Sequence, residues 1–343
     1  MRKLAHIEKV TNIRPIEGAD NIEQVNILGW NVVVKKNEFK EGDLCVYIEI
    51  DSICPEKPHF EFLRNKNFKV KTIKLRGVIS QGLILPIDIL PKGHYNVGDD
   101  VTTVLGITKH DDSEITFPNR PVKKYKGWKK LYYKLFGKSK KKKSDFPSWV
   151  KKTDETRIQN MPHVLDTNDL FVITEKVDGC SATFTLRKKL FGYEYVVCSR
   201  NRIADKDSCY TEMSKKYDIE NNLKDLFKKF GCEKHITIQG EIVGPKIQSN
   251  KYKLKENDLY VFNLLVDGEL LDSRYAARRL EYRKFKFVPI LGRSQLPKTV
   301  DEMVKLADGK SKLEDVLREG LVIRKRDTSF KVISNEFLLK HKL

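Results

Sequence analysis

The sequence has no long apolar segment. No run of 18 apolar residues occurs in its 343 positions, and no apolar core follows the basic start Met1-Arg2-Lys3. We therefore expect neither a membrane span nor a secretion signal. No C-x-x-C pair occurs either, which argues against a zinc finger and, with irregularly spaced thiols, favours a reducing cytoplasm. The six cysteines are Cys45, Cys54, Cys180, Cys198, Cys209 and Cys232.

The common signatures of phosphate and metal sites are also missing. Phe136-Gly-Lys-Ser139 and Asp308-Gly-Lys-Ser311 look like the end of a P-loop, but the first glycine of G-x-x-x-x-G-K-S falls at Tyr132 and Val304. No G-x-G-x-x-G, H-E-x-x-H or EF-hand spacing occurs, and the seven histidines are dispersed. The sequence thus contains no Walker A motif and suggests no histidine-based metal cluster.

Acidic residues are absent from one long stretch. Between Lys123 and Lys143 there are 11 lysines and no carboxylate, so this stretch supplies 11 of the 19 net positive charges. Trp128, Tyr132, Leu135 and Phe136 fall near helical spacing, which predicts an amphipathic helix followed by a basic loop. Such a segment can bind a nucleic-acid backbone or a membrane surface, act as a nuclear-localisation signal, or be a solvated linker.

The first 90 or so residues show short strand patterns separated by turns. Lys71, Lys74 and Arg76 form a basic cluster, which favours an OB-fold barrel over nucleic acid or nucleotide phosphates, with plain solubility as the alternative. The run from Ile16 to Ile22 is similar to the tRNA-binding OB modules of synthetases, which supports the barrel more than any substrate. The five predicted strands are Ala5–Ile16, Val25–Lys36, Leu44–Cys54, Phe68–Leu75 and Ser80–Pro86.

A single lysine motif in the second half has the strongest chemical meaning. Lys176 lies in Glu175-Lys-Val-Asp-Gly179, directly after the apolar run Leu170–Thr174, which reads as a buried strand. A lysine can attack phosphorus only when unprotonated, so its pKa must fall through burial, nearby cations or a metal ion. We expect Arg200, Arg202, Lys340 and Lys342 to supply the cations.

Polar residues recur at strand ends downstream of this lysine. Arg200 and Arg202, in Cys198–Arg202, can clamp a phosphate. Glu241 interrupts the β-branched run Ile236–Gly244, and burying such a carboxylate is costly unless it meets a ligand, a metal or a cation. Phe262 or Tyr260 offers a stacking face for a purine, although aromatics in such a run are more often core residues.

The last segment carries further candidates. Glu319 begins the predicted strand Glu319–Arg324, where it is a candidate metal ligand. Lys340 and Lys342 alternate onto one face of a final predicted strand, within reach of the same phosphate. Amphipathic helices are predicted at Asn222–Phe230, Arg274–Lys286 and Asp301–Leu306.

In order and spacing, these segments resemble motifs I, Ia, III, IV and V of the covalent nucleotidyltransferases. Two further resemblances narrow the family to RNA ligases of the Naegleria and Deinococcus type, which carry an N-terminal OB domain. Ser334-Asn335 with Leu338–Lys342 resembles motif V of the RNA ligase 2-like group, and Lys152–Asn160 resembles the segment before the nucleotidyl lysine.

The resemblance implies a role for each matching residue. Lys176 would be the adenylylated nucleophile, with Glu175 beside it in the nucleotide site. Glu241 would contact the ribose, and Phe262 would stack on adenine. Glu319 would hold the metal. Phosphates of AMP or RNA would be contacted by Lys340, Lys342, Arg157, Arg200 and Arg202, and the RNA backbone by Lys138, Lys140, Lys141, Lys142 and Lys143.

The resemblance also implies the whole architecture and reaction. We expect an α+β protein with an OB-fold barrel (1–104), a lysine-rich connector (105–150) and an ATP-grasp-like nucleotidyltransferase domain of antiparallel sheets with flanking helices (151–343). It would be a monomeric, cytoplasmic or nuclear RNA ligase using ATP with Mg²⁺ or Mn²⁺ to seal RNA ends, with a nicked duplex as the expected substrate. A DNA or RNA-DNA hybrid ligase and a non-catalytic RNA-binding protein are the alternatives.

The resemblance also implies a catalytic role for the N-terminal barrel. In relatives with an OB domain after motif V, that domain orients the departing pyrophosphate. Because this sequence stops at motif V, we expect the N-terminal barrel to assist pyrophosphate departure rather than AMP departure.

Overall fold

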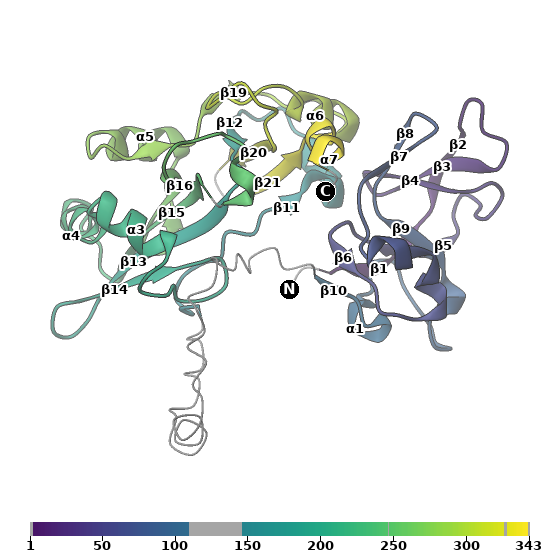
Figure 1. The fold of residues 1–343 in the computed structure, drawn as a ribbon, viewed down its shortest axis with the longest axis horizontal. Helices are drawn as coiled ribbons and strands as arrows, with labels where there is room; N and C mark the ends of the chain where they lie inside the picture. The colour runs from purple at the N-terminus through teal and green to yellow at the C-terminus, as the bar shows by residue number, and fades with distance from the viewer. Residues whose placement is uncertain (1–2, 110–145, 246, 326–327, 342–343) are drawn as a thin grey trace, which may run out of the picture.

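The computed structural model describes residues 3–109, 146–245, 247–325 and 328–341. It consists of an N-terminal barrel and a larger C-terminal part with two sheets and flanking helices (Figure 1), which confirms the predicted α+β class. The predicted helix at 128–136 and the loop lysines at 138 and 140–143 lie outside these residues. None of the helices in the described ranges is long and apolar enough to cross a membrane.

The barrel is built from short antiparallel strands. Three-stranded sheets of order β1-β5-β9 and β2-β3-β4 enclose a core around Trp30, Tyr47 and Ile7, none of which is exposed. Pairs β7-β8 and β10-β6 complete it, with one short helix, α1, and 3-10 turns η1 and η2. The bounds are β1 Ala5–Lys9, β2 Thr11–Pro15, β3 Ile22–Ile27, β4 Trp30–Lys35, β5 Leu44–Ile48, β6 Ser52–Ile53, η1 Pro58–Lys66, β7 Ile73–Leu75, β8 Val78–Ser80, β9 Leu83–Pro86, η2 Ile87–Ile89, α1 Thr102–Leu105 and β10 Thr108–Lys109.

Three predicted barrel strands are each interrupted. The prediction of one strand from 25 to 36 is wrong, because Leu28, in the left-handed region at φ 54°, and Gly29 turn the chain between β3 and β4. The predicted strand from 5 to 16 is divided between β1 and β2, which lie in different sheets, and Asn12 has φ 51° where β2 begins. The predicted strand from 44 to 54 is divided between β5 and β6, which lie in different sheets, and Asp51 has φ 67° just before β6 begins. Apolar patterning concealed the break between β3 and β4, since Ile27 and Trp30 on either side of it are buried.

The C-terminal part contains two sheets that face each other across the site. One has the order β11-β21-β20-β12-β19, and the other has the order β14-β13-β15-β16-β17, with β18 pairing to β16. The bounds are β11 Thr156–Arg157, β12 Phe171–Lys176, β13 Cys180–Lys188, β14 Tyr193–Cys198, β15 His235–Val243, β16 Asp258–Val266, β17 Glu269–Leu270, β18 Lys286–Phe287, β19 Ile290–Ser294, β20 Gly320–Lys325 and β21 Thr328–Ile333.

Amphipathic helices cover the outer faces of these sheets. Helices α3, α4 and α5 bury apolar side chains against β13, β15 and β16, and α6 packs against β20 and β21. The predicted helices at 222–230 and 301–306 are confirmed, whereas the one at 274–286 ends early because residues 286–287 pair with β16 as β18. The bounds are η3 Ile158–Asn160, η4 Pro162–Leu165, α3 Cys209–Lys216, α4 Ile219–Lys229, η5 Gln248–Asn250, α5 Ser273–Glu281, α6 Val300–Ala307 and α7 Asn335–His341.

The predicted final strand is wrong. Residues 335–341 form helix α7, and the hydroxyl of Ser334 accepts a hydrogen bond from the backbone N–H of Phe337 at 3.1 Å, as an N-cap does. Lys340 therefore lies in the last turn of a helix, and Lys342 is outside the described residues.

The barrel is packed directly onto the C-terminal part. Ile333 at the end of β21 and Leu338 of α7 belong to the same apolar core as the barrel strands. Figure 1 shows α7, in yellow, on the side of the C-terminal part that faces the barrel. Polar bonds join the two parts as well: Trp30 Nε1 donates to Asn160 Oδ1 at 2.7 Å, and Gln81 Nε2 donates to Asn335 Oδ1 at 3.1 Å.

Candidate active site

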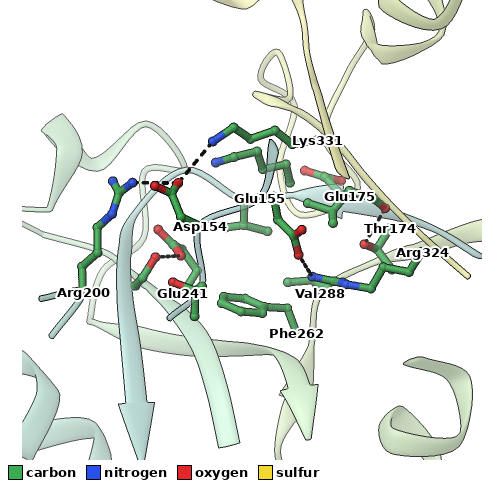
Figure 2. A pocket seen from close by; sticks show the side chains of 15 residues that line it. Asp154, Glu155, Thr174, Glu175, Arg200, Glu241, Phe262, Val288, Arg324 and Lys331 are labelled. Carbon is green, nitrogen blue, oxygen red and sulfur yellow. Dashed lines mark hydrogen bonds and ion pairs between the residues drawn. The ribbon is translucent and has the colours of Figure 1, made fainter. Parts of the chain in front are cut away.

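A pocket between the two C-terminal sheets brings together five of the predicted site residues, Glu175, Lys176, Arg200, Glu241 and Phe262 (Figure 2). β12, β20 and β21 contribute from one sheet, and β13, β15 and β16 contribute from the other. The pocket is lined by Thr153, Asp154, Glu155, Thr174, Glu175, Lys176, Val177, Ser181, Arg200, Glu241, Phe262, Val288, Val322, Arg324 and Lys331.

Lys176 stands at the end of β12, opposite the start of β20. The register pairs Lys176 with Gly320, so Glu319 lies beside the lysine, and Lys176 Nζ lies 2.6 Å from Glu319 Oε2. Glycine is required after this strand, because a Cβ on Gly179 would lie 2.3 Å from the carbonyl oxygen of Ile242. The motif therefore places one amine between the two sheets.

Carboxylates, rather than the expected cations, surround this amine. Burial lowers the pKa of Lys176, but the charges of Glu319, Glu241 and Asp178 outweigh it and leave that pKa raised. The expectation that protein cations lower it is therefore wrong for the free enzyme. A protonated Lys176 is a poor nucleophile, so its activation requires positive charge brought by what binds in the pocket.

Glu241 is held on β15 within reach of the lysine. Ser181 Oγ donates to Glu241 Oε2 at 3.0 Å. Burial is the largest cause that raises the pKa of Glu241, to about 8, with Glu319 and Asp178 adding to it against the attraction of Lys176. The pKa of Glu319 is raised by burial in the same way. The carboxyl groups of Glu241, Glu319 and Asp178 thus cluster around Lys176, an arrangement that favours binding of a cation.

These carboxylates suit a hard divalent cation. No group of three His, Cys, Asp or Glu side chains in the described residues is arranged to hold a metal ion by itself. Glu319, with Asp178 and Glu241 nearby, instead offers oxygen ligands of the kind that Mg²⁺ and Mn²⁺ accept when phosphates and water complete the shell. The residues present therefore fit a metal that arrives with a nucleotide.

Of the remaining predicted residues, some face the pocket and others hold neighbouring loops in place. Arg200 lines the pocket and pairs with Asp154 at 3.0 Å, and Phe262 lines it whereas Tyr260 does not. Glu175 also lies there, but its carboxylate accepts hydrogen bonds from Ser311 and the backbone of Lys312. Glu175 therefore positions a loop, and its carboxylate is already committed.

Three predicted phosphate contacts lie elsewhere. Arg157 is buried at the joint with the barrel, 3.3 Å from Asp51 and with its guanidinium 5.6 Å from the centre of the Trp30 ring. Arg202 closes the turn after β14, where its carbonyl accepts from Ser199, and it does not line the pocket. Lys340 on α7 does not line it either.

The sequence prediction missed four charged residues of the pocket: Asp154, Glu155, Arg324 and Lys331. Strand alternation was an available signal for Lys331, because Phe330 and Val332 are buried in the core and leave Lys331 on the pocket side. Lys331 Nζ lies 3.5 Å from Asp154 Oδ1. Lys331, and not Lys340, lines the pocket.

Comparisons with known proteins agree with this site. An OB-fold domain model matches residues 4–87, and an RNA ligase model matches residues 169–341, about half of the chain. A comparison with curated protein sequences finds no match.

Solved structures match over the full length. Naegleria gruberi RNA ligase with pyrophosphate is 33% identical, with a TM-score of 0.82, covering 100% of this chain and 99% of that one. A glutamate-to-alanine variant of the same ligase with ATP and Mn is 32% identical, with a TM-score of 0.83 and 100% coverage of both chains. A lysine-to-methionine variant with AMP and Mn is 33% identical, with a TM-score of 0.81 and 99% coverage of both. The chain belongs to the RNA ligase family.

Proposed function

We propose that the protein joins a 3′-hydroxyl and a 5′-phosphate of RNA, using ATP and forming a covalent AMP adduct on Lys176. The observation that carries this proposal is the convergence of Lys176, Glu241 and Phe262 on one pocket, with Glu319 paired to Lys176. The relatives with ATP or AMP and Mn support the choice of nucleotide and cation.

The first reaction displaces pyrophosphate. Lys176 Nζ, once deprotonated, attacks the α-phosphorus of ATP; the N–P bond forms as the bond to the bridging oxygen breaks, and pyrophosphate leaves. A divalent cation on Glu319 would supply the positive charge that lowers the lysine pKa and neutralises the phosphate. Glu319, which pairs with Lys176 in the structure, would be the residue that holds this cation.

The next two reactions use the adduct. An oxygen of the RNA 5′-phosphate attacks the AMP phosphorus and displaces Lys176, and the 3′-hydroxyl then attacks the RNA 5′-phosphorus and releases AMP. Glu241 accepts hydrogen bonds from the ribose hydroxyls, and Phe262 stacks on the base. Arg200 and Lys331, at the wall where Asp154 pairs with both, are the cations in reach of the phosphates.

We propose a nicked duplex as substrate, bound by a monomer in the cytoplasm. The net charge of +19 favours a long polyphosphate ligand, and the lysines at 138–143 are the sequence candidates for its backbone. Six free cysteines, all buried, are compatible with a reducing compartment.

The test is incubation with α-labelled ATP or GTP, followed by denaturing electrophoresis. We expect label from ATP on the protein, and none on Lys176→Ala. Lys176→Arg should fail as well, because a guanidinium stays protonated. Lys305→Ala, which removes an exposed lysine of α6, is the matched control.

Recovery of the labelled adduct from Lys176→Ala would refute the assignment of the nucleophile. Nicked duplexes with RNA or DNA on either side of the break, offered to the parent enzyme, then show which strand must carry ribose. Sealing of an all-DNA nick at the rate of an RNA nick would refute the RNA assignment.

A further inference from the structure

Two thiols lie in contact behind one wall of the pocket. Cys180 begins β13 and Cys209 begins helix α3, and their Sγ atoms are 3.9 Å apart. Both side chains are buried in the same apolar core, with exposed fractions of 8% and 3%. The described part of the chain includes all six cysteines, and within it this is the only hydrogen-bonding contact between two thiols.

The start of β13 also shapes the pocket. Successive side chains of a strand point to opposite faces, so Cys180 lies in the core while its neighbour Ser181 lines the pocket. Ser181 Oγ in turn donates to Glu241. On the other side of Cys180, Gly179 is so close to β15 that it leaves no room for a Cβ. We therefore expect a displacement of Cys180 to move Ser181 and Glu241.

Cys209 is the more reactive of the two thiols. It occupies the first position of α3, after the N-cap Ser208, and the dipole at a helix N-terminus stabilises a thiolate. The hydrogen bond from the Cys180 thiol lowers the pKa of Cys209, although burial opposes this shift. Burial instead raises the pKa of four other thiols, to about 11 or 12: Cys45, Cys54, Cys198 and Cys232. An oxidant should therefore react at Cys209 first.

We propose that Cys180 and Cys209 form a reversible disulfide that switches off formation of the Lys176 adduct, a step that rests on the proposed function. The oxidant is hydrogen peroxide, which is little larger than water. The Cys209 thiolate attacks one peroxide oxygen, the O–O bond breaks, and a sulfenic acid forms while hydroxide takes up a proton and leaves as water. The Cys180 sulfur then attacks the sulfenic sulfur. The S–S bond forms as the S–O bond breaks, and the second water carries away the Cys180 proton. The two thiols together lose two electrons, which the peroxide gains.

The disulfide requires β13 and α3 to move. An S–S bond is about 2.05 Å long, so the sulfur atoms must approach each other by roughly 1.9 Å from their separation of 3.9 Å. Side-chain rotation supplies only part of this movement, because both side chains lie in a packed core. A misplacement of about 1 Å can cost roughly a hundredfold in rate. In a reducing compartment such disulfides are transient and sense oxidants, and thiol exchange reverses them.

The test treats the full-length protein with hydrogen peroxide and measures two quantities. The first is the state of the cysteines, determined by alkylation in denaturant and peptide mass spectrometry. Four of the six cysteines should be alkylated, and Cys180 should be linked to Cys209. The second is the rate of adduct formation from labelled ATP. This rate should fall about tenfold or more, and treatment with dithiothreitol should restore it.

Three variants identify the responsible thiols. Cys209→Ser should keep its initial rate after peroxide, and Cys180→Ser serves if that variant fails to fold. Cys232→Ser removes another buried thiol of the same core and is the matched control, which should lose its rate as the parent does.

Three results would each refute the proposal: no disulfide between Cys180 and Cys209 in the treated parent, a disulfide without loss of rate, or equal inactivation of Cys209→Ser and the parent. Absence of any adduct in the reduced parent would instead refute the proposed function. The cysteine map uses no nucleotide, so it would still decide whether the pair is oxidised.

Discussion

At the scale of single residues, the environment of Glu241 keeps its carboxyl group protonated to an unusually high pH. Its carboxyl is buried beside Glu319 and Asp178, and its pKa is raised to about 8, whereas an unfolded chain gives a glutamate its ordinary value near 4.5. The folded protein therefore binds a proton that the unfolded chain has released. Its contribution to stability is complete below about pH 4.5 and is lost as the pH rises toward 8.

We predict that Glu241→Gln makes the free protein less sensitive to pH. Without metal and nucleotide, the melting temperature of the parent should fall between pH 5 and pH 8, and the fall in the variant should be smaller by roughly 2 °C or more. Thermal melts of both proteins in a chelating buffer measure this difference. Parallel curves would mean that Glu241 is ionised in the folded protein, with Lys176 compensating its charge.

At the scale of elements, β20 and β21 position the chemistry through close backbone contact. A Cβ on Gly320 would lie 2.1 Å from the carbonyl oxygen of Val332 and 2.9 Å from the Cα of Ile333. β20 follows Glu319 directly, and β21 carries Lys331. A side chain at position 320 must therefore push apart the two strands that hold pocket residues.

We predict that Gly320→Ala lowers both stability and adduct formation. Overpacking of this kind costs roughly 1–3 kcal/mol, so the melting temperature should drop by roughly 2 °C or more. The labelled adduct should fall further than the folded fraction, because Glu319 moves with the strand. Gly93→Ala is the control, since its Cβ would meet Tyr95 at an ordinary 3.6 Å. Parental activity in Gly320→Ala would show that the strands adjust freely.

Strands marked by a local run of apolar residues could be predicted from the sequence. Contacts between residues that are far apart in the sequence could not. Continuous apolar and β-branched runs located β12, β15, β16 and β20, and with them Lys176, Glu241 and Phe262. The predicted final strand failed because the alternate positions of Lys340 and Lys342 were given more weight than the helix signals at Ser334 and Glu336. Arg324 and Glu155 were missed because they meet only across 169 positions of sequence, a pairing that no local pattern encodes.

At the scale of the whole molecule, the barrel and the C-terminal part share a polar joint. Asn160 accepts from Trp30 Nε1 and donates to Glu49, and the nearby Arg157 pairs with Asp51. The segment that carries Asn160 also supplies Thr153, Asp154 and Glu155 to the pocket. We therefore expect a movement of the barrel to displace Thr153, Asp154 and Glu155 in the pocket.

We predict that Asn160→Ala impairs the first reaction more than the last. The change leaves the buried indole N–H of Trp30 without its acceptor, at a cost of roughly 1–3 kcal/mol, and loosens the barrel. If the barrel orients pyrophosphate, adduct formation from ATP should fall about tenfold or more, while sealing of RNA that already carries a 5′-adenylate changes little. Single-turnover rates of both reactions measure this. An equal loss in the rates of both reactions would mean that the barrel only binds RNA or supports the fold. Asn96→Ala, on an exposed loop, is the control.

The placement of Ile333 and Leu338 in the barrel core has a consequence for how the protein is made. Domains generally fold in the order in which they leave the ribosome. Here the barrel strands emerge first, but two of their core side chains are synthesised more than two hundred residues later. The barrel cannot be complete until β21 and α7 have been translated, and these are the elements that follow Glu319 and carry Lys331. The barrel, although it is synthesised first, and the catalytic pocket are therefore both completed only when β21 and α7 fold.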